Sequence, residues 1–170
     1  MEKQDEILNK VAESSLITFD LEDLYTHGQR ISFDIVSVLF EGLILREKDF
    51  REFVKNQNWS DYTNKLVNVY CSTDAIIPTW AYMLIASCIQ PYARKLVMGS
   101  TQTLEEVLFS EAIGKVEVGN FREKRVVVKG CSKVDVPDAA YFEITNKLLP
   151  VVKSIMFGEA CSTVPIYKKH

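Results

Sequence analysis

The sequence predicts an α/β protein with a mainly parallel sheet, and three observations support this fold class. From residue 65 onward, short apolar stretches alternate with longer amphipathic ones, as strands and helices do in βαβ folds. The same part of the chain contains two copies of one β-α-β unit. Before residue 60, two stretches alternate apolar and polar residues, which indicates an N-terminal β extension.

Composition is that of an ordinary globular protein. Of 170 residues, 47% are hydrophobic and 25% are charged, and the net charge of −3 gives no electrostatic case for a nucleic-acid partner. No apolar run reaches the roughly 18 residues that span a bilayer, and no signal-peptide pattern opens the chain. We therefore expect a cytoplasmic protein without a membrane partner. We expect one domain over residues 1–170, with the extension at 1–60 and the repeated core at 61–170.

The expected elements follow in order along the chain. Residues 5–13 suggest a short amphipathic helix, and residues 16–25 and 30–38 suggest a hairpin around a turn at 26–29. A helix fills the second half of 39–57, and a polar loop follows at 58–64. In the core we expect strands at 65–71, 94–99, 124–131 and 154–161, and helices at 78–93, 103–116 and 137–153. Thr103 and Glu106 have the spacing of a capping box.

The internal repeat appears when Pro78 is aligned with Pro137. Read forward without gaps, six of 22 positions are identical, namely Pro78/Pro137, Ala81/Ala140, Tyr82/Tyr141, Ile85/Ile144, Pro91/Pro150 and Gly99/Gly158. Read backward, Cys71-Ser72 meets Cys131-Ser132 after a one-residue difference in the loop. Two copies of one β-loop-α-β unit therefore build the core.

Two such units predict a sheet in the order 2-1-3-4 with helices on both faces. Crossovers between parallel strands are right-handed, so the helices leave on opposite faces when the two first strands are neighbours. The carboxyl ends of those strands then form a topological switch point, where open α/β sheets bind ligands. Neighbouring strands are about 4.8 Å apart, so we expect Cys71 and Cys131 to approach each other there. Cys161, beyond the last strand, is expected within about 4–7 Å of both sulfurs.

Three converging thiols predict a metal centre. Cys71, Cys131 and Cys161 could hold zinc with a fourth ligand, or an iron–sulfur cluster with one open corner. Oxygen ligands could come from carboxylates in the same loops, at Asp74, Asp135 and Glu159. The spacing is unlike a CxxC pair, so this prediction depends on the expected geometry. The fourth cysteine, Cys88, is interpreted as a small buried hydrophobe in a helix.

Two other kinds of function fit the same loops. Thiolates near helix N-termini are stabilised by the helix dipole, which suits a sulfur carrier or a redox enzyme. The loops are also rich in hydroxyls and could bind a phosphate or carboxylate, through Ser72, Thr73, Asp74, Ser132, Lys133, Glu159, Ser162 and Thr163. In an anion-binding or protein-interaction module of this kind, the cysteines would be structural.

Four stretches also carry a resemblance to a known family: "LFEGLILREKDFRE", "CSTDAIIPTWAYML", "VVVKGCSKV" and "PVVKSIMFGEACSTVP". Together they resemble the uncharacterised bacterial family called domain of unknown function 2480, over about residues 16–169. Members of that family tend to be encoded near the sulfur-mobilisation machinery of iron–sulfur assembly. The resemblance therefore implies iron–sulfur chemistry or sulfur handling, with iron–sulfur assembly proteins as partners. Its motifs contain Cys71, Cys131 and Cys161, each followed by serine.

Overall fold

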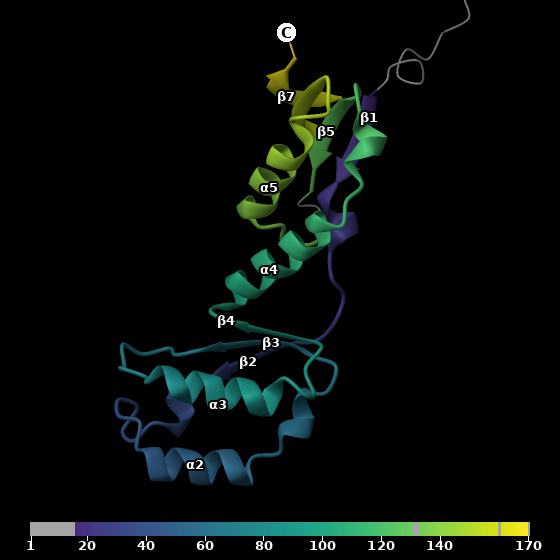
Figure 1. Ribbon diagram of the computed structural model, residues 1–170. Coiled ribbons are helices and arrows are strands. Elements are labelled where there is room, and N and C mark those ends of the chain that lie inside the picture. The colour runs from purple at the N-terminus through teal and green to yellow at the C-terminus, as the bar shows by residue number, and fades with distance from the viewer. Residues whose placement is uncertain (1–15, 131–132, 160, 170) are drawn as a thin grey trace, which may run out of the picture. The chain divides into compact units, whose positions relative to one another are not determined.

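The computed structural model describes residues 16–130, 133–159 and 161–169. Its strands lie in two separate, mostly parallel sheets, and helices connect the parallel strands (Figure 1). The backbone forms two compact units: unit 1 comprises Met1–Tyr25 and Phe109–His170, and unit 2 comprises Thr26–Leu108. Unit 2 is thus inserted between the two chain segments of unit 1. A single domain over 1–170 stays a prediction.

Unit 1 contains sheet A, with strands in the order β1-β5-β6-β7. Its strands are β1 (Leu16–Asp20), β5 (Arg125–Lys129), β6 (Ser154–Glu159) and β7 (Ser162–Lys168). The first three are parallel, whereas β7 runs antiparallel to β6 with a register shift at Ile155/Met156. Helix α5 (Asp138–Leu148) connects β5 to β6. The short 3-10 helices η1 (Leu21–Leu24) and η4 (Val118–Phe121) follow β1 and precede β5.

Unit 2 contains sheet B, in which β2 (Arg30–Asp34), β3 (Leu66–Tyr70) and β4 (Lys95–Met98) are parallel in that order. Helix α3 (Thr79–Ile89) connects β3 to β4. Between β2 and β3 come η2 (Ile35–Val38), α2 (Glu47–Asn56) and η3 (Trp59–Tyr62). Helix α4 (Thr101–Gly114) continues from unit 2 into unit 1, changing unit after Leu108.

Each unit buries an apolar core under the helix of its own repeat. In α3, Ala81, Ile85 and Ile89 are fully buried at a spacing of four residues, which places them on one face of the helix. In α5, the buried residues are Ala140, Ile144 and Leu148, at the same spacing. Full burial of one Ile or Leu side chain contributes roughly 1.5–3 kcal/mol. The repeat therefore preserves the helix face that attaches each helix to its sheet.

The other face of sheet B packs against the first part of α4. Leu66 forms a small core with Leu104 and Leu108. Nearby, Arg30 makes a two-pronged ion pair with Glu105, with Nε and Nη2 lying 2.8 and 3.0 Å from the carboxylate oxygens. Paired guanidinium and carboxylate groups of this geometry fix orientation as well as charge. These contacts hold the start of α4 to unit 2.

The prediction of one sheet in the order 2-1-3-4 is wrong. β3 pairs with β2 and β4, and β5 pairs with β1 and β6, so the first strands of the two repeats are not neighbours. The expected hairpin over 16–38 is wrong for the same reason, because its two strands belong to different sheets. Each of them pairs in parallel with the first strand of one repeat. The N-terminal extension therefore completes both units and does not form a separate ribbon.

The side chains at the ends of these strands explain the failure of the hairpin. Asp20 Oδ1 accepts a hydrogen bond from the Glu22 N–H at 3.0 Å, and Asp34 Oδ1 accepts one from the Val36 N–H at 3.1 Å. Each aspartate thereby ends its strand and starts a 3-10 helix, in place of a tight reversal. The alternating pattern continued to residues 25 and 38 in the sequence, but the strands end at residues 20 and 34.

Other boundaries differ in smaller ways. Helix α4 begins at Thr101, because the Ser100 hydroxyl accepts the Thr103 N–H at 3.2 Å; Ser100 is the capping residue, and Thr103 is not. The strand expected to continue through residue 161 ends at Glu159, and the chain returns as β7. Pro165 is accommodated there because β7 is an edge strand. The helix expected at 5–13 lies outside the described residues. Among the described helices, none is long and apolar enough to cross a membrane.

Candidate functional site

The three cysteines of the predicted metal centre are distributed over both units. Cys71 follows β3 in unit 2 and is half-buried, whereas Cys161 is exposed at the turn between β6 and β7 in unit 1. Cys131 and Ser132 lie outside the described residues. The expected approach of Cys71 to Cys131 required β3 and β5 to be neighbouring strands, but they belong to different sheets. In the part of the chain that the structure describes, no three His, Cys, Asp or Glu residues are grouped to hold a metal ion.

The predicted binding residues of unit 2 lie in the exposed loop between β3 and α3. The Ser72 N–H donates to Asp34 Oδ1 at 3.1 Å. The Thr73 hydroxyl donates to the Gly42 carbonyl at 3.1 Å and lies 3.5 Å from Cys71 Sγ. Asp74 is exposed beside them. The loop is thus held by its own polar groups, and the hydroxyl of Thr73 is already engaged.

The predicted binding residues of unit 1 come from two different loops. The Lys133 N–H donates to Glu22 Oε1 at 2.8 Å, and Glu159 Oε1 lies 3.7 Å from Lys129 Nζ. Ser162 and Thr163 begin β7, where the Thr163 hydroxyl donates to Met156 Sδ at 3.7 Å. Cys88, interpreted as a small buried hydrophobe, lies on α3 and is half-buried.

Asp34 is the centre of a polar cluster at the carboxyl end of sheet B. Burial raises the pKa of Asp34, but hydrogen bonds from the Ser72 side chain, from the N–H groups of Val36 and Ser72, and from the Tyr70 side chain outweigh it, so the pKa lies below its ordinary value. For Tyr82 on α3, burial raises the pKa of the phenol, and Cys71 and Asp34 raise it further. Asp34 thus remains a charged acceptor at neutral pH, and it ties the end of β2 to the β3–α3 loop.

The two repeats align without a gap, and this alignment does not pair Cys71 with Cys131 as the sequence prediction did. β3 and β5 begin at residues 66 and 125, α3 and α5 at 79 and 138, and β4 and β6 at 95 and 154, a constant shift of 59 residues. The loop has the same length in both units. Cys131 therefore corresponds to Ser72, and Cys71 corresponds to Gly130. A Cβ atom at Gly130 would lie 2.7 Å from Tyr141 Oη, so in unit 1 the Tyr141 hydroxyl leaves no room for a side chain at the position of Cys71.

Both units carry an apolar groove between the repeat helix and the adjoining strands. In unit 2 the groove has a volume of about 440 Å³ and is lined by residues of α3 and β4, among them Tyr82, Met83, Leu96 and Met98. In unit 1 the groove has a volume of about 510 Å³ between α5 and β6. Its lining includes Ile166, which β7 contributes.

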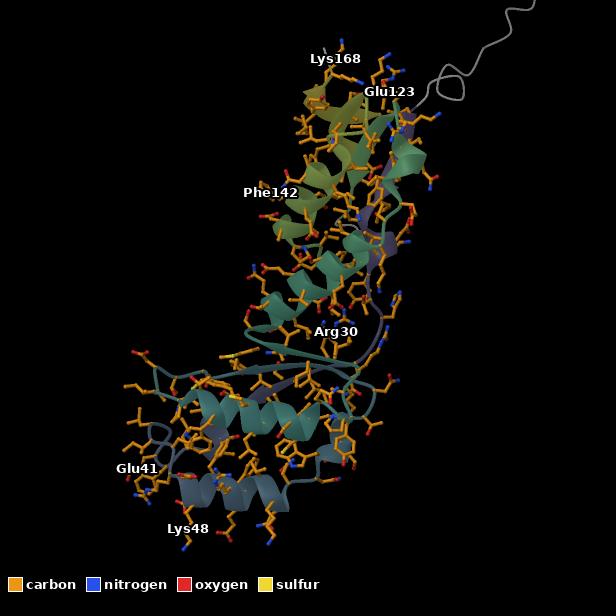
Figure 2. All side chains as sticks on the ribbon, viewed as in Figure 1. Arg30, Glu41, Lys48, Glu123, Phe142 and Lys168 are labelled. Carbon is orange, nitrogen blue, oxygen red and sulfur yellow. The ribbon has the colours of Figure 1, made fainter. Side chains whose placement is uncertain are left out.

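The two grooves occupy the same place in the repeat. Eight of the nine lining residues of each groove match at the shift of 59 residues, including the pairs Tyr82/Tyr141, Met83/Phe142, Leu96/Ile155 and Met98/Phe157. Two of these pairs are exposed to solvent. The exposed fractions are 67% for Met83, 72% for Phe142, 65% for Met98 and 46% for Phe157. Figure 2 shows Phe142 projecting outward from α5.

Comparison with known proteins identifies the family. The model of the family described as "Protein of unknown function (DUF2480)" matches residues 5–169. The chain belongs to this family. No curated protein and no solved structure matches the chain. The four short motifs had indicated this family, and the match over nearly the full length of the chain confirms it.

The groove residues of this DUF2480 protein were not among the predicted site residues. The sequence nevertheless indicates them, because the two repeats carry large apolar residues at matching positions outside the buried helix faces. The buried positions of α3 are 81, 85 and 89, so Met83 lies off the buried face, and Phe142 lies off the corresponding face of α5. Large apolar residues at two matching positions outside the core face indicate a surface that core packing does not explain.

Proposed function

We propose that the protein is an interaction module that binds apolar segments of partner proteins in two equivalent grooves, one on each unit. The observation that supports this proposal is the matched exposure of Met83 with Phe142 and of Met98 with Phe157. A residue needed only for the core would be buried, and although single exposed apolar residues are common, their recurrence at matching groove positions of both units is not explained by core packing. Here, both units retain large apolar side chains at two solvent-facing positions.

The lining of the grooves sets the chemistry of the partner. Methionine side chains are flexible and polarizable and adapt to different apolar ligands, and two of them line the unit 2 groove. In unit 1, Asp138 and Thr145 replace the Thr79 and Ala86 of unit 2. We therefore expect unit 2 to take a wholly apolar segment, and unit 1 to take one in which a basic residue accompanies the apolar ones.

The expected strength follows from the area that would be covered. Complete burial of one Met or Phe side chain contributes roughly 1.5–3 kcal/mol, and association itself costs several kcal/mol. Two exposed side chains per groove therefore support a weak and reversible complex. This affinity range suits a protein that exchanges partners.

Selection from a phage-displayed peptide library on the immobilised full chain tests the proposal. We expect enrichment of peptides with clustered apolar residues, and at least about tenfold weaker binding to the double variant Met83→Glu/Phe142→Glu. Tyr92→Glu is the matched control, because Tyr92 is also an exposed large side chain but lines neither groove. Peptides that bind wild type and double variant equally would contradict the proposal.

A second candidate function uses the thiols, and the accessibility of two of them favours it. Cys161 is exposed and Cys71 is half-buried, and each follows the carboxyl end of a strand. In this proposal Cys71, Cys131 and Cys161 bind an iron–sulfur cluster or zinc, and the partners are iron–sulfur assembly proteins of a reducing cytoplasm. A sulfur carrier or redox enzyme uses the same thiols without metal.

Metal analysis of protein purified without oxygen separates these possibilities. A metal centre requires stoichiometric iron or zinc that is lost in Cys131→Ala. A sulfur-handling thiol requires metal-free protein in which one of the three cysteines reacts quickly with an alkylating agent near neutral pH. Metal-free protein without a fast thiol excludes both and leaves the interaction module.

A further inference from the structure

Strand β4 has an unpaired edge in the described part of sheet B. The Lys95 N–H donates to the Lys65 carbonyl, and the Gly99 N–H donates to the Val69 carbonyl, so these odd-numbered residues direct their backbone groups toward β3. Backbone groups alternate in direction along a strand, and the N–H and C=O groups of Leu96 and Met98 therefore point away from β3. The order β2-β3-β4 places no strand on that side.

The matching edge in unit 1 is covered. Ile155 and Phe157 are the counterparts of Leu96 and Met98, and their outward side carries the antiparallel strand β7. Phe157 lies opposite Val164, and Ile155 lies opposite Tyr167. In unit 1, the outer edge of the last repeat strand thus pairs with an extended segment that runs antiparallel to it. The equivalent edge of β4 in unit 2 can pair in the same way.

The two outermost strands also differ in how well they resist further pairing. β7 carries Pro165 and a β-bulge, two features that discourage another strand from adding to an edge, whereas each of the two strands has a lysine at one end. β4 reads Lys-Leu-Val-Met, with neither a proline nor a register shift. Met98, at its end, is 65% exposed. The edge of sheet B is therefore suited to pairing, whereas the edge of sheet A is protected from it.

We propose that β4 pairs antiparallel with β4 of a second copy of this chain, around a twofold axis that passes beside Val97. A twofold axis perpendicular to a sheet relates edge strands in antiparallel fashion, which is the orientation of β7 on β6. With Val97 on the axis, Leu96 lies opposite Met98 of the second copy. Both residues direct their N–H and C=O groups outward, so each of the two symmetric pairs forms two hydrogen bonds.

A second copy fits better than an unrelated strand, because this register is self-complementary. Leu96 and Met98 both line the groove, and side chains directly opposite in an antiparallel pair lie on the same face. The pairing therefore joins the apolar walls of the two unit 2 grooves. Strand β4 of the second copy supplies the wall that Ile166 of β7 supplies in unit 1. The dimer follows solely from the free edge of β4 in the described part of sheet B. Only the statement that the dimer completes the peptide grooves rests on the proposed function.

Sedimentation equilibrium of the full chain over a range of concentrations tests the dimer. We expect a reversible monomer–dimer equilibrium, and a dimer dissociation constant raised at least about tenfold by Met98→Glu, because two carboxylates would then face the shared apolar wall. Met98→Pro is the second variant: it removes an N–H that points outward, and so it should abolish the dimer without loss of the β3–β4 ladder. Circular dichroism confirms that both variants are folded.

Met83→Glu is the matched control, because Met83 lines the same groove from α3 and has no part in the strand pairing. It should retain the dimer and lose peptide binding at the unit 2 groove, while the unit 1 groove still binds, so that failure of the dimer and failure of the interaction module are distinguished. Amide hydrogen exchange gives the register: the Leu96 and Met98 N–H groups should exchange slowly in the dimer and quickly in Met98→Glu. A monomer at every concentration overturns the proposal, as does a dimer in which both amides exchange quickly.

Discussion

Unit 1 and unit 2 share one plan and differ mainly at the edge of the sheet. Each has an N-terminal strand followed by a 3-10 helix, then a β-α-β repeat with a buried helix face and an exposed apolar groove. In unit 1 the last repeat strand is covered by β7, but in unit 2 the corresponding β4 has no further partner in its described sheet. The β-α-β repeat and its groove are therefore common to both units, whereas the strand that covers the sheet edge is a feature of unit 1.

The loops after the first repeat strands provide a second contrast. Asp34 accepts the Ser72 N–H and so holds the loop of unit 2, whereas Asp20 lies 3.1 Å from Lys129 Nζ in unit 1. Lys129 takes the place of Tyr70, and Gly130 takes the place of Cys71. Equivalent backbones therefore carry different side chains at the carboxyl end of each sheet. In this respect the grooves resemble each other more closely than the cysteine loops do.

The largest expected effect concerns the shared core. Ile85 and Ile144 are matching, fully buried residues, and Ile→Ala at either position should lower the free energy of unfolding by about 2–5 kcal/mol. Urea unfolding followed by circular dichroism measures both variants. A loss below about 1 kcal/mol at either position would show that the two helices are not packed equivalently.

The same variants test whether the units unfold together. Both tryptophans, Trp59 and Trp80, lie in unit 2, so their fluorescence reports on that unit alone. Helix α4 contributes Leu104 and Leu108 to one core and Phe109 and Ile113 to the other. We therefore expect Ile144→Ala in unit 1 to lower the fluorescence midpoint as well. An unchanged fluorescence midpoint would contradict the prediction of a single cooperative domain.

Matching glycines after β4 and within β6 should differ in sensitivity. Gly158 has φ +115°, and an added Cβ would lie 2.6 Å from the Ser162 carbonyl oxygen. Gly99 has φ +136°, and its added Cβ would meet the Thr103 side chain at 2.8 Å. Substitution by Ala should cost about 1–3 kcal/mol at each, with the larger loss at Gly158, because a backbone oxygen of the β6–β7 turn cannot rotate away. Thermal unfolding of both variants, compared with wild type, gives the order.

The smallest expected effect is the pH dependence that Asp34 contributes in unit 2. Because the pKa of Asp34 is lowered in the folded protein, its ionised form stabilises the fold above the ordinary carboxyl pKa, and this contribution is lost as the pH falls through the folded value. Asp34→Asn should cost about 1 kcal/mol at neutral pH, as loss of a capping carboxylate does. The difference in melting temperature between the two proteins should shrink on acidification. A difference that is constant down to acid pH would show that the charge of Asp34 is not involved.

The sequence identified the local elements better than their pairing. Strands near 66–70, 95–98, 125–129 and 154–159 and the helices between them were predicted, because their periodicity is local. Whether β1 pairs with β2 or with β5 depends on contacts between residues far apart in the chain, and period-two alternation is the same for either choice. The turn signal at 26–29 favoured a hairpin, but the side-chain bonds of Asp20 and Asp34 end both strands before it.

The candidate site was less predictable than the fold. Cysteines attracted interest by their chemistry, and their convergence followed from a sheet order that the structure does not have. The grooves depend on exposure, and a sequence does not state the exposure of Met83 or Phe142. The repeat alignment held the necessary information once its register was known, because it places apolar residues at matching positions off the buried helix faces.

Methionine methyl NMR tests the central claim, that equivalent grooves on the two units bind apolar partners. Of four methionines, Met83 and Met98 line the unit 2 groove and Met156 lines the unit 1 groove. With ¹³C-methyl methionine in the full chain, titration with a peptide selected on wild type should shift the Met83 and Met98 signals together, or that of Met156, or all three. A selected peptide that binds tightly and shifts none of these three signals would place its site elsewhere and contradict the account.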